Sequence, residues 1–454
     1  MKPRRMSDVA RAVGGLFLGQ DSEVSTVATD SRLVERGALF VALPGTRTDG
    51  GKFVAEAFDN GASGALVRDG LDVDAGPAVW VRSTSDALVR LAADERSRSQ
   101  ATVVGIAGAN GKTSTKDMTA AVLATRLRVH ASPESFNNEV GLPVTLLGAP
   151  ADTEAIVAEM GARHVGDVAE LCRIARPHVV VVTNVGVAHM EIFGSWDRIV
   201  EASAEPVEAI APDGVAVLNA DDGIVAGYAE RCPGRVVTFG LSPGADVRAE
   251  GVKLGSDGLA TFDLVHDGSR ARVSLAVPGE HMVANALAAA AVGLTLGIEA
   301  EGCARGLGDA TVSRWRMETF TTPEGVRVLN DAYNANPESM AAALKTARWM
   351  AGEGHLIAVL GAMAELGPIT AGAHERLGEL AARMRVDRLI TIGSEARAIA
   401  SAGVREGVEP ENVASYDDAE EALEDVRRAA RPGDVVLFKA SRMAGLEKVA
   451  EALR

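Results

Sequence analysis

The sequence lacks any long uninterrupted apolar run among its 454 residues. A helix needs about 20 consecutive apolar residues to cross a bilayer, so we do not expect a membrane protein or a membrane-bound one. The N-terminal Met-Lys-Pro-Arg-Arg is similar to the basic region of a signal peptide, but Asp8 and Arg11 interrupt the stretch that follows. These features predict a cytoplasmic location.

Cysteine is scarce, with Cys172, Cys232 and Cys303 as the three residues of this type. They are odd in number, far apart and without the spacing of metal ligands, which disfavours a disulfide framework or a zinc site. We expect buried free thiols in a reducing compartment.

The chain also has no excess of positive charge: it contains 46 Lys and Arg and 62 Asp and Glu, which gives a net charge of −16. No basic face is evident that would neutralise phosphates, so a nucleic-acid partner is not expected and small molecules are favoured.

Aromatic residues make up 4% of the chain. Few aromatics and many alanines are typical of tightly packed helices but mark no assembly surface, and we expect a monomer.

The chain is too long for one hydrophobic core and indicates about three domains of α/β class. Residues 1–98 predict a small mixed α/β module. Within it we expect a strand at Gly37–Leu43, a helix at Phe53–Asn60 and a strand at Gly64–Val67.

Residues 99–311 alternate apolar runs with helical segments, the pattern of a doubly wound, mostly parallel sheet. Residues 246–276 favour antiparallel hairpins before a helix near 281–296. Residues 312–454 predict a Rossmann-like α/β domain. The expected strands of the last two domains are Val103–Ile106, Ala155–Ala158, Val179–Thr183, Val215–Leu218, Val236–Phe239, Leu356–Leu360, Leu389–Ile392 and Val435–Phe438.

A glycine-rich turn joins the first apolar strand of the central domain to an amphipathic helix that begins near Thr113. Gly105, Gly108 and Gly111 let successive backbone N–H groups face one anion, and the helix N-terminus adds partial positive charge. The usual phosphate loop has glycine where this chain has Ile106, so the loop is a variant. An ordinary strand-to-helix turn is the structural alternative.

The next residues of this loop are a lysine and a threonine, the pair that nucleotide-binding loops use. Lys112 is expected to reach the outer phosphates of a nucleotide, and the Thr113 hydroxyl to bind Mg²⁺. Gly-Lys-Thr after a buried strand is a specific combination. It predicts a nucleotide site.

Polar residues follow two further strands of the expected central sheet. Glu159 ends the run Ala155–Ala158, and Asn184 and His189 follow Val179–Thr183. Ligands bind beyond the carboxyl ends of parallel strands, so these groups converge on one crevice with the phosphate loop. Glu159, His189 and the Thr113 hydroxyl suit Mg²⁺ held partly by phosphates. Considered one at a time, His189 could be a hydrogen-bonded structural histidine and Glu159 a solvated carboxylate at the end of a strand.

The third domain adds a second polar segment, in which Asn336 is expected to cap a helix whose first residue is Pro337. Asp331, Asn334 and Asn336 are candidates for hydrogen bonds to the ribose and base of a nucleotide, although a capped helix alone explains the stretch equally well. Arg316 is a candidate cation for the γ-phosphate.

Taken together, these motifs resemble the Mur ligase family, whose members join an amine to a carboxylate at the expense of ATP. The resemblance covers nearly the whole chain. The segments that carry it are Ala107-Gly-Ala-Asn-Gly-Lys-Thr-Ser114, Ser135-Phe-Asn-Asn-Glu-Val-Gly-Leu-Pro143, Glu159-Met-Gly161, Thr183-Asn-Val-Gly-Val-Ala-His189, Pro278-Gly-Glu-His-Met-Val-Ala-Asn285, Asp331-Ala-Tyr-Asn-Ala-Asn-Pro337 and Glu365-Leu-Gly367.

Within the family, the 135–138 and 331–337 segments are most similar to the member that adds D-alanyl-D-alanine to a UDP-N-acetylmuramoyl tripeptide. The N-terminal Thr29-Asp-Ser-Arg32 and Gly45-Thr-Arg-Thr-Asp-Gly50 resemble its UDP-sugar-binding segments. The resemblance implies catalytic roles for Lys112, Glu159, His189 and Arg316, magnesium ligation by Thr113, Glu159 and His189, ATP contacts from Gly108, Asn110, Gly111, Lys112, Thr113, Ser114, Asn285, Arg316, Asp331, Asn334 and Asn336, and substrate contacts from Ser31, Arg32, Thr46, Asp49, Asn137 and Asn138.

The implied reaction has two steps. The terminal carboxylate of the tripeptide attacks the γ-phosphate of ATP and gives an acyl phosphate and ADP; the dipeptide amine then displaces phosphate through a tetrahedral intermediate. Lys112, Arg316 and Mg²⁺ would offset the charge on the transferring phosphoryl group. A second Mg²⁺ near Glu159 and His189 would bridge the carboxylate and the phosphate, and domain closure would complete the site.

The chain differs from the family at one position that matters for metal binding. The family usually carries a carbamylated, magnesium-binding lysine two residues before a glutamate that corresponds to Glu205, and this chain has Ser203 there. A neutral, short hydroxyl lacks the charge and reach of a carbamate. Pro206 also suggests that this helix starts, kinks or ends differently. Smaller departures are Gly51, Ala362 and Ala440.

Three interpretations stay open. The first is the peptidoglycan ligase itself. The second is a paralogue that applies the same acyl-phosphate chemistry to another acid and amine, because a fold does not fix its substrate. The third is a catalytically weak nucleotide-binding protein.

Overall fold

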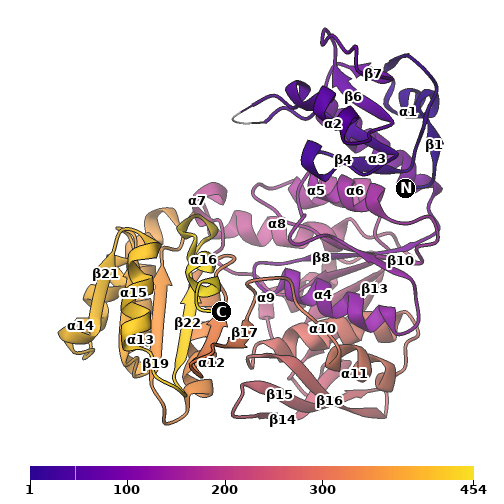
Figure 1. Cartoon of the computed structure of the whole chain (residues 1–454). Helices are drawn as coiled ribbons and strands as arrows, with labels where there is room; N and C mark the ends of the chain where they lie inside the picture. Colours follow the sequence, from indigo (N-terminus) through magenta and orange to yellow (C-terminus); the bar gives the residue numbers. More distant parts are fainter. Residues whose placement is uncertain (46–47) are drawn as a thin grey trace.

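Three large sheets follow one another along the chain in the computed structural model, which describes residues 1–45 and 48–454 (Figure 1), and a two-stranded antiparallel sheet of β1 (Arg4–Arg5) and β3 (Glu23–Val24) adds to the first of them. In the view of Figure 1 the N-terminal unit lies above the central one, against α5 (Gly141–Gly148) and α6 (Asp167–Ala175), and the C-terminal unit lies to the left of the central one. The α/β class and the three-part arrangement expected from the sequence are confirmed. The exact domain boundaries at residues 98 and 311 stay predictions.

The N-terminal sheet has the order β2-β7-β6-β5-β4, with β2 antiparallel to its neighbour and the rest parallel. Its two central strands, β5 and β6, are buried almost throughout, as parallel strands covered on both faces are. The elements are β1 (Arg4–Arg5), α1 (Met6–Val13), β2 (Leu16–Leu18), β3 (Glu23–Val24), β4 (Thr26–Ala28), β5 (Ala38–Val41), α2 (Val54–Asp59), β6 (Gly64–Arg68), β7 (Ala78–Val81) and α3 (Thr84–Arg98).

The central sheet has nine strands in the order β16-β15-β14-β13-β12-β11-β8-β10-β9. It is parallel from β9 to β14, and β14, β15 and β16 form the antiparallel hairpins expected at 246–276. Its strands are β8 (Thr102–Ala107), β9 (Val129–Ala131), β10 (Ala155–Glu159), β11 (Val179–Val182), β12 (Val215–Asn219), β13 (Arg235–Gly240), β14 (Val247–Leu254), β15 (Leu259–His266) and β16 (Ser269–Pro278). The helices are α4 (Lys112–Ala124), α5 (Gly141–Gly148), α6 (Asp167–Ala175), α7 (Met190–Phe193), α8 (Trp196–Glu208), α9 (Gly223–Gly227), α10 (Met282–Thr295) and α11 (Ala300–Gly308).

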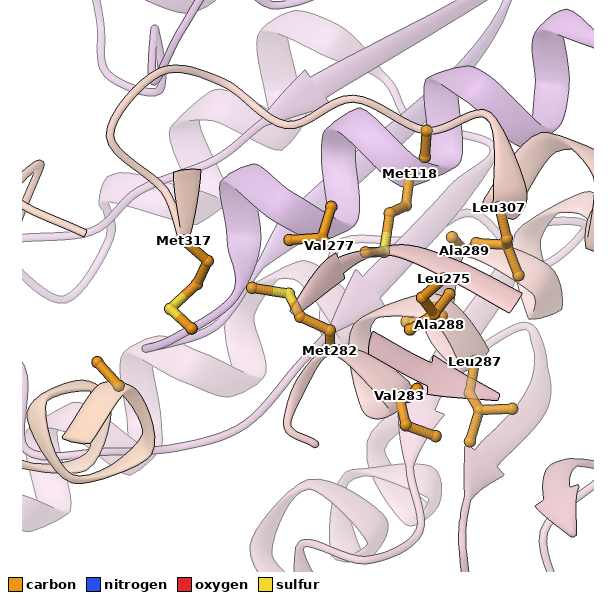
Figure 2. Close-up of a cluster of buried hydrophobic side chains, with 14 of the residues drawn as sticks. Met118, Leu275, Val277, Met282, Val283, Leu287, Ala288, Ala289, Leu307 and Met317 are labelled. Atoms are coloured by element: carbon orange, nitrogen blue, oxygen red, sulfur yellow. The ribbon is translucent and has the colours of Figure 1, made fainter. Parts of the chain in front are cut away.

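The helix that follows the glycine-rich loop, α4, is held by a dense apolar core. Figure 2 shows Met118 of α4 among side chains of β16, α10 and α11. Small residues let these helices approach closely: a Cβ on Gly293 of α10 would lie 2.5 Å from Val122 Cγ1 of α4. Because α4 is packed this tightly, its N-terminal turn provides a rigid base for the loop.

The C-terminal sheet has the order β17-β18-β22-β19-β20-β21, with β17 as an antiparallel edge strand. This is the expected Rossmann-like pattern of alternating strands and helices. The elements are β17 (Glu318–Thr321), β18 (Arg327–Asn330), α12 (Pro337–Ala351), β19 (Leu356–Gly361), α13 (Thr370–Arg383), β20 (Arg388–Ile392), α14 (Arg397–Arg405), β21 (Val413–Tyr416), α15 (Ala419–Ala429), β22 (Val435–Lys439) and α16 (Leu446–Glu451).

The cysteines follow the expected pattern with one exception. Cys172 and Cys303 are buried and free, and burial raises the pKa of each thiol to about 12. Cys232 is free but only half-buried, so the expectation of a buried thiol was wrong there. Among the residues that the structure describes, no helix combines the length and apolar character needed to span a bilayer.

Candidate active site

A cleft of about 990 Å³ lies between the central and C-terminal units. The carboxyl ends of β8, β10 and β11 form its floor, the position where parallel sheets bind ligands. It is lined by the residues that the sequence singled out in these two units, namely Gly108, Asn110, Gly111, Lys112, Thr113, Ser114, Asn137, Asn138, Glu159, His189, Asn285, Arg316, Asp331, Asn334 and Asn336.

The glycine-rich loop has a backbone that side chains would disrupt. Gly108 has φ +127°, and a Cβ there would lie 2.1 Å from Thr183 Oγ1. Gly111 has φ +79°, and its Cβ would lie 2.3 Å from Asn285 Oδ1. Thr183 Oγ1 donates to the carbonyl of Asn110 at 2.7 Å, which ties the loop to the end of β11. The loop is therefore a preformed cradle at the N-terminus of α4.

Lys112 folds back over this cradle. Its Nζ donates to the carbonyl oxygens of Gly108, at 2.7 Å, and Ala109, at 3.2 Å. Burial lowers the pKa of Lys112, the Glu159 charge opposes the shift and the Arg316 charge adds to it. Among the described residues no carboxylate lies within ion-pair distance of Nζ, so a phosphate oxygen would give this cation its anionic partner.

Thr113 and Glu159 form the oxygen-rich centre of the cleft. Thr113 Oγ1 donates to Glu159 Oε2 at 2.8 Å, and Asn137 Nδ2 donates to Glu159 Oε1 at 2.8 Å. Glu159 is 1% exposed. A hydroxyl and a carboxylate this close suit Mg²⁺, which binds one or two carboxylates and completes its shell with phosphate oxygens and water. Within residues 1–45 and 48–454, no group of three or more His, Cys, Asp or Glu side chains is placed to hold a metal ion.

His189 contacts a partner from the C-terminal unit. It has φ +59° and precedes α7, and its Nδ1 donates to Glu365 Oε2. Burial lowers the pKa of His189, and the bond to Glu365 opposes that shift. His189 and Glu159 line the same cleft but bond to different groups, so their sharing of one Mg²⁺ stays a prediction.

Arg316 reaches the central unit from the segment before β17. Its Nη2 donates to Thr113 Oγ1 at 3.2 Å and Ser135 Oγ at 3.4 Å, and its guanidinium lies 4.1 Å from the Tyr333 ring centroid. The buried Nε has no protein partner among the described residues. A cation stacked on an aromatic ring and directed at Thr113 is placed to meet an outer phosphate.

The 331–337 segment combines structural and accessible groups. Asp331 Oδ2 accepts from Lys439 Nζ at 2.5 Å and its Oδ1 from the Met317 N–H at 3.0 Å, while each oxygen keeps capacity for a further bond. Asn336 caps α12, which begins at Pro337 as expected. Its Nδ2 also donates to Asn110 Oδ1 at 2.7 Å, joining this cap to the phosphate loop.

The N-terminal candidates lie away from the cleft. Ser31 Oγ donates to Glu56 Oε2 at 3.2 Å, Arg32 pairs with Asp30, and Asp49 Oδ1 accepts from the Gly51 N–H at 2.8 Å. Thr46 lies outside the described residues. The substrate-binding roles of these four residues stay predictions.

Several residues that shape the cleft were missed. Lys116 Nζ donates to the carbonyls of Ser132 and Glu134 at 2.8 Å each, and it braces the segment that carries Ser135 and Asn137. Asp117 Oδ2 accepts from Ser313 N and Oγ at 2.7 and 2.9 Å and anchors the connection to the C-terminal unit. Charged residues on an amphipathic helix suggest a solvated face, and only contacts between distant segments show otherwise.

Ser203 is half-buried on α8 and lines the cleft. Glu205 faces another way: its Oε2 accepts from the Ala169 N–H at 2.9 Å and its Oε1 from the Gly166 N–H at 2.5 Å, so it caps α6. Pro206 lies inside α8, which ends two residues later at Glu208. The helix therefore continues through the proline, and whether it starts, kinks or ends differently from the family's helix stays a prediction.

Comparison with known proteins gives a consistent result along the chain. Residues 23–105 match the family description "Mur ligase family, catalytic domain", residues 106–293 "Mur ligase middle domain" and residues 315–442 "Mur ligase, glutamate ligase domain". The UDP-N-acetylmuramoyl-tripeptide–D-alanyl-D-alanine ligase of Mycobacterium tuberculosis H37Rv is 40% identical over 99% of this chain and 97% of its own. The enzyme of that name from Bacillus subtilis 168 is 35% identical over 100% and 99%.

Solved structures agree. MurF from Acinetobacter baumannii superposes with a TM-score of 0.87 at 30% identity, covering 100% of this chain and 99% of that one. MurF ligase from Thermotoga maritima in complex with ADP superposes with a TM-score of 0.81 at 30% identity, covering 95% and 97%.

Proposed function

This chain belongs to the Mur ligase family, and we propose on that premise that it adds D-alanyl-D-alanine to a UDP-N-acetylmuramoyl tripeptide, as an ATP-dependent, ADP-forming ligase of peptidoglycan precursor synthesis. The observation that carries the proposal is the meeting of three elements in one cleft. These are the Lys112 loop, the Thr113–Glu159 pair and Arg316 from the next unit.

The first step of the proposed reaction joins two anions. The tripeptide carboxylate attacks the γ-phosphate, the bond from that phosphorus to the bridging oxygen breaks, and an acyl phosphate and ADP result. The loop N–H groups and the N-terminus of α4 hold the phosphates, Lys112 offsets their charge, and Arg316, which reaches Thr113 from the C-terminal unit, offsets the charge of the transferring group. We assign Mg²⁺ to Thr113 and Glu159, where it would supply charge neutralisation.

In the second step the neutral amine of the dipeptide attacks the acyl carbon, phosphate leaves from a tetrahedral intermediate, and the proton lost by the nitrogen goes to the departing phosphate. The same cations stabilise the departing phosphate. We assign the amine substrate to the C-terminal unit and the tripeptide to Asn137 and Asn138. The UDP-sugar is assigned to the N-terminal module, with Ser31, Arg32, Thr46 and Asp49 as its contacts. We also propose a monomeric protein of the cytoplasm, in line with the scarcity of cysteine and the acidic composition.

A coupled assay of ADP release tests the proposal. It compares UDP-N-acetylmuramoyl tripeptide plus D-alanyl-D-alanine with a panel of other acid–amine pairs. We expect the named pair to be turned over fastest. A faster alternative pair would identify a paralogue with another substrate, the second candidate that Ser203 in the cleft favours. No ADP with any pair would identify a nucleotide-binding protein.

Lys112→Met is the matched catalytic test. Loss of its charge is expected to lower kcat by about 10²–10³-fold, because one preorganised donor at a developing charge contributes that much. Lys448→Met makes the same chemical change at an exposed position and should leave the rate unchanged. Equal rates for the two variants would contradict the assigned role of Lys112.

A further inference from the structure

Glu365, in the segment after β19, makes contacts with the central unit that the proposed mechanism does not use. Its carboxylate oxygens go to two different partners: Oε2 accepts from His189 Nδ1, and Oε1 pairs with the Arg163 guanidinium. Its backbone carbonyl accepts from the Glu191 N–H at 3.1 Å. One residue of the C-terminal unit thus contacts the central unit through three separate acceptor atoms.

The segment that presents Glu365 is tightly built. Glu365 has φ +61° and Gly367 φ +56°, and a Cβ on Gly367 would lie 3.1 Å from Glu191 Cα. The preceding residues are fixed within their own unit, because the Met363 N–H donates to His374 Nε2 at 3.0 Å and the Ala364 N–H to Ser441 Oγ at 2.9 Å. Glu365 is therefore a rigid projection and not a side chain on a loose loop.

The two partners of its carboxylate belong to the two loops that frame the cleft. Arg163 follows β10, the strand that ends in Glu159, and His189 follows β11, whose next residue ties down the phosphate loop. Arg163 is 61% exposed and the Glu365 side chain 30%, so the Arg163 pair alone contributes little. Its effect lies in geometry, because one carboxylate holds both loops at a fixed separation.

We propose that Glu365 is a positioning residue for the ligase reaction proposed above: docking of the C-terminal unit delivers its carboxylate to Arg163 and His189 and sets both loops for phosphoryl transfer. The arrangement makes the first step conditional on closure. This has a chemical advantage, because an acyl phosphate is open to hydrolysis and forms only once the unit that carries the amine has covered the cleft.

The test compares Glu365→Ala and Glu365→Gln with Glu395→Gln, a change of an exposed carboxylate in the same unit. We expect Glu365→Ala to lower kcat by about 10²-fold, the effect of a small misplacement of reacting groups, with the KM for ATP nearly unchanged. Glu365→Gln keeps one acceptor and one donor and should recover part of the rate. Arg163→Ala should lower kcat less, and adding it to Glu365→Ala should cause no further loss, since both remove one contact.

Hydrogen exchange with ADP bound gives a readout apart from turnover. Amides of residues 161–166 and 185–194 should exchange faster in Glu365→Ala than in the parent protein and in Glu395→Gln. Unchanged exchange, additive losses with Arg163→Ala, or a rise in the KM for ATP that accounts for the whole effect would overturn the proposal. If the parent protein turns over no acid–amine pair, the proposed function fails by itself, and the exchange result still decides whether Glu365 orders these loops.

Discussion

The family resemblance places Ser203 where the family usually carries a carbamylated lysine, and Ser203 lines the same cleft as the glycine-rich loop. A serine hydroxyl does not react with carbon dioxide to give a stable anionic ligand. We therefore expect ADP release to be the same in carbon dioxide-depleted buffer and with added bicarbonate at near-neutral pH. The coupled assay measures this directly.

A strong bicarbonate dependence would contradict that expectation. It would mean that a lysine elsewhere has taken the role of the missing carbamate, and the Ser203→Ala variant would then show the same dependence as the parent protein. A rate that is unaffected by bicarbonate but lost in Ser203→Ala would instead assign the hydroxyl itself a place at the site.

At the scale of elements, the phosphate loop depends on Gly108 for two reasons, its φ of +127° and the 2.1 Å approach of a Cβ to Thr183 Oγ1. Gly108→Ala is expected to destabilise the protein by about 1–3 kcal/mol and to abolish nucleotide binding, because the loop must move away from β11. Calorimetric titration with ADP and a thermal melt measure the two effects.

Gly166→Ala is the matched control for this loop variant. Gly166 has φ +101° and lines the same cleft, but a Cβ there would meet nothing within 4 Å. Like Gly108→Ala, Gly166→Ala places a side chain at a positive φ, but its Cβ collides with no other atom. It should therefore lower the stability of the protein and leave its affinity for ADP unchanged. Equal loss of affinity in both variants would show that general strain, and not the cradle, explains the effect.

The Asn336 side chain at the start of α12 has two separable roles: one atom caps the helix, and another contacts the phosphate loop. Asn336 Oδ1 accepts from the Ser339 N–H at 2.9 Å, while Nδ2 donates to Asn110 Oδ1 at 2.7 Å. Asn336→Asp keeps the cap and removes the donor to the phosphate loop, so stability should hold and ADP affinity should fall. Asn336→Ala removes both and should cost a further ~1 kcal/mol in unfolding free energy. A stability loss in Asn336→Asp as large as in Asn336→Ala would contradict this division.

The elements also show what the sequence alone can predict. Long buried runs such as Val179–Val182 and the capped start of α12 rest on local patterns, and both were predicted. The short edge strand β9 was missed, because its three residues are half-buried and carry little periodicity. The cleft-lining groups near the phosphate loop were predicted from motifs. Lys439 at the end of β22 is buried against Asp331, which follows the neighbouring strand β18; it was missed because that pairing joins segments 108 positions apart.

At the scale of the whole molecule, apolar cores cross the unit boundaries. One core joins Leu88 and Leu91 of the N-terminal α3 to Leu142 and Leu146 of α5, and another joins Met118 to C-terminal residues such as Leu329. Polar contacts add to this, from Arg316 to Thr113 and from Asn336 to Asn110. Because the units share these contacts, we expect a ligand bound in the cleft to stabilise all three units together.

This coupling predicts that a non-hydrolysable ATP analogue stabilises the whole protein, and does so through Mg²⁺. Binding to the folded state at 100 times the Kd contributes about 2.7 kcal/mol, which corresponds to a rise of several degrees in Tm. With EDTA the rise should largely disappear, because Thr113 and Glu159 then face the phosphates without a bridging cation and the buried Glu159 carboxylate repels them. Lys112→Met should reduce the rise as well, and Mg²⁺ alone should cause none. Calorimetric melts of the four samples measure it, and an equal rise with and without EDTA would show that Glu159 holds no metal when the nucleotide binds.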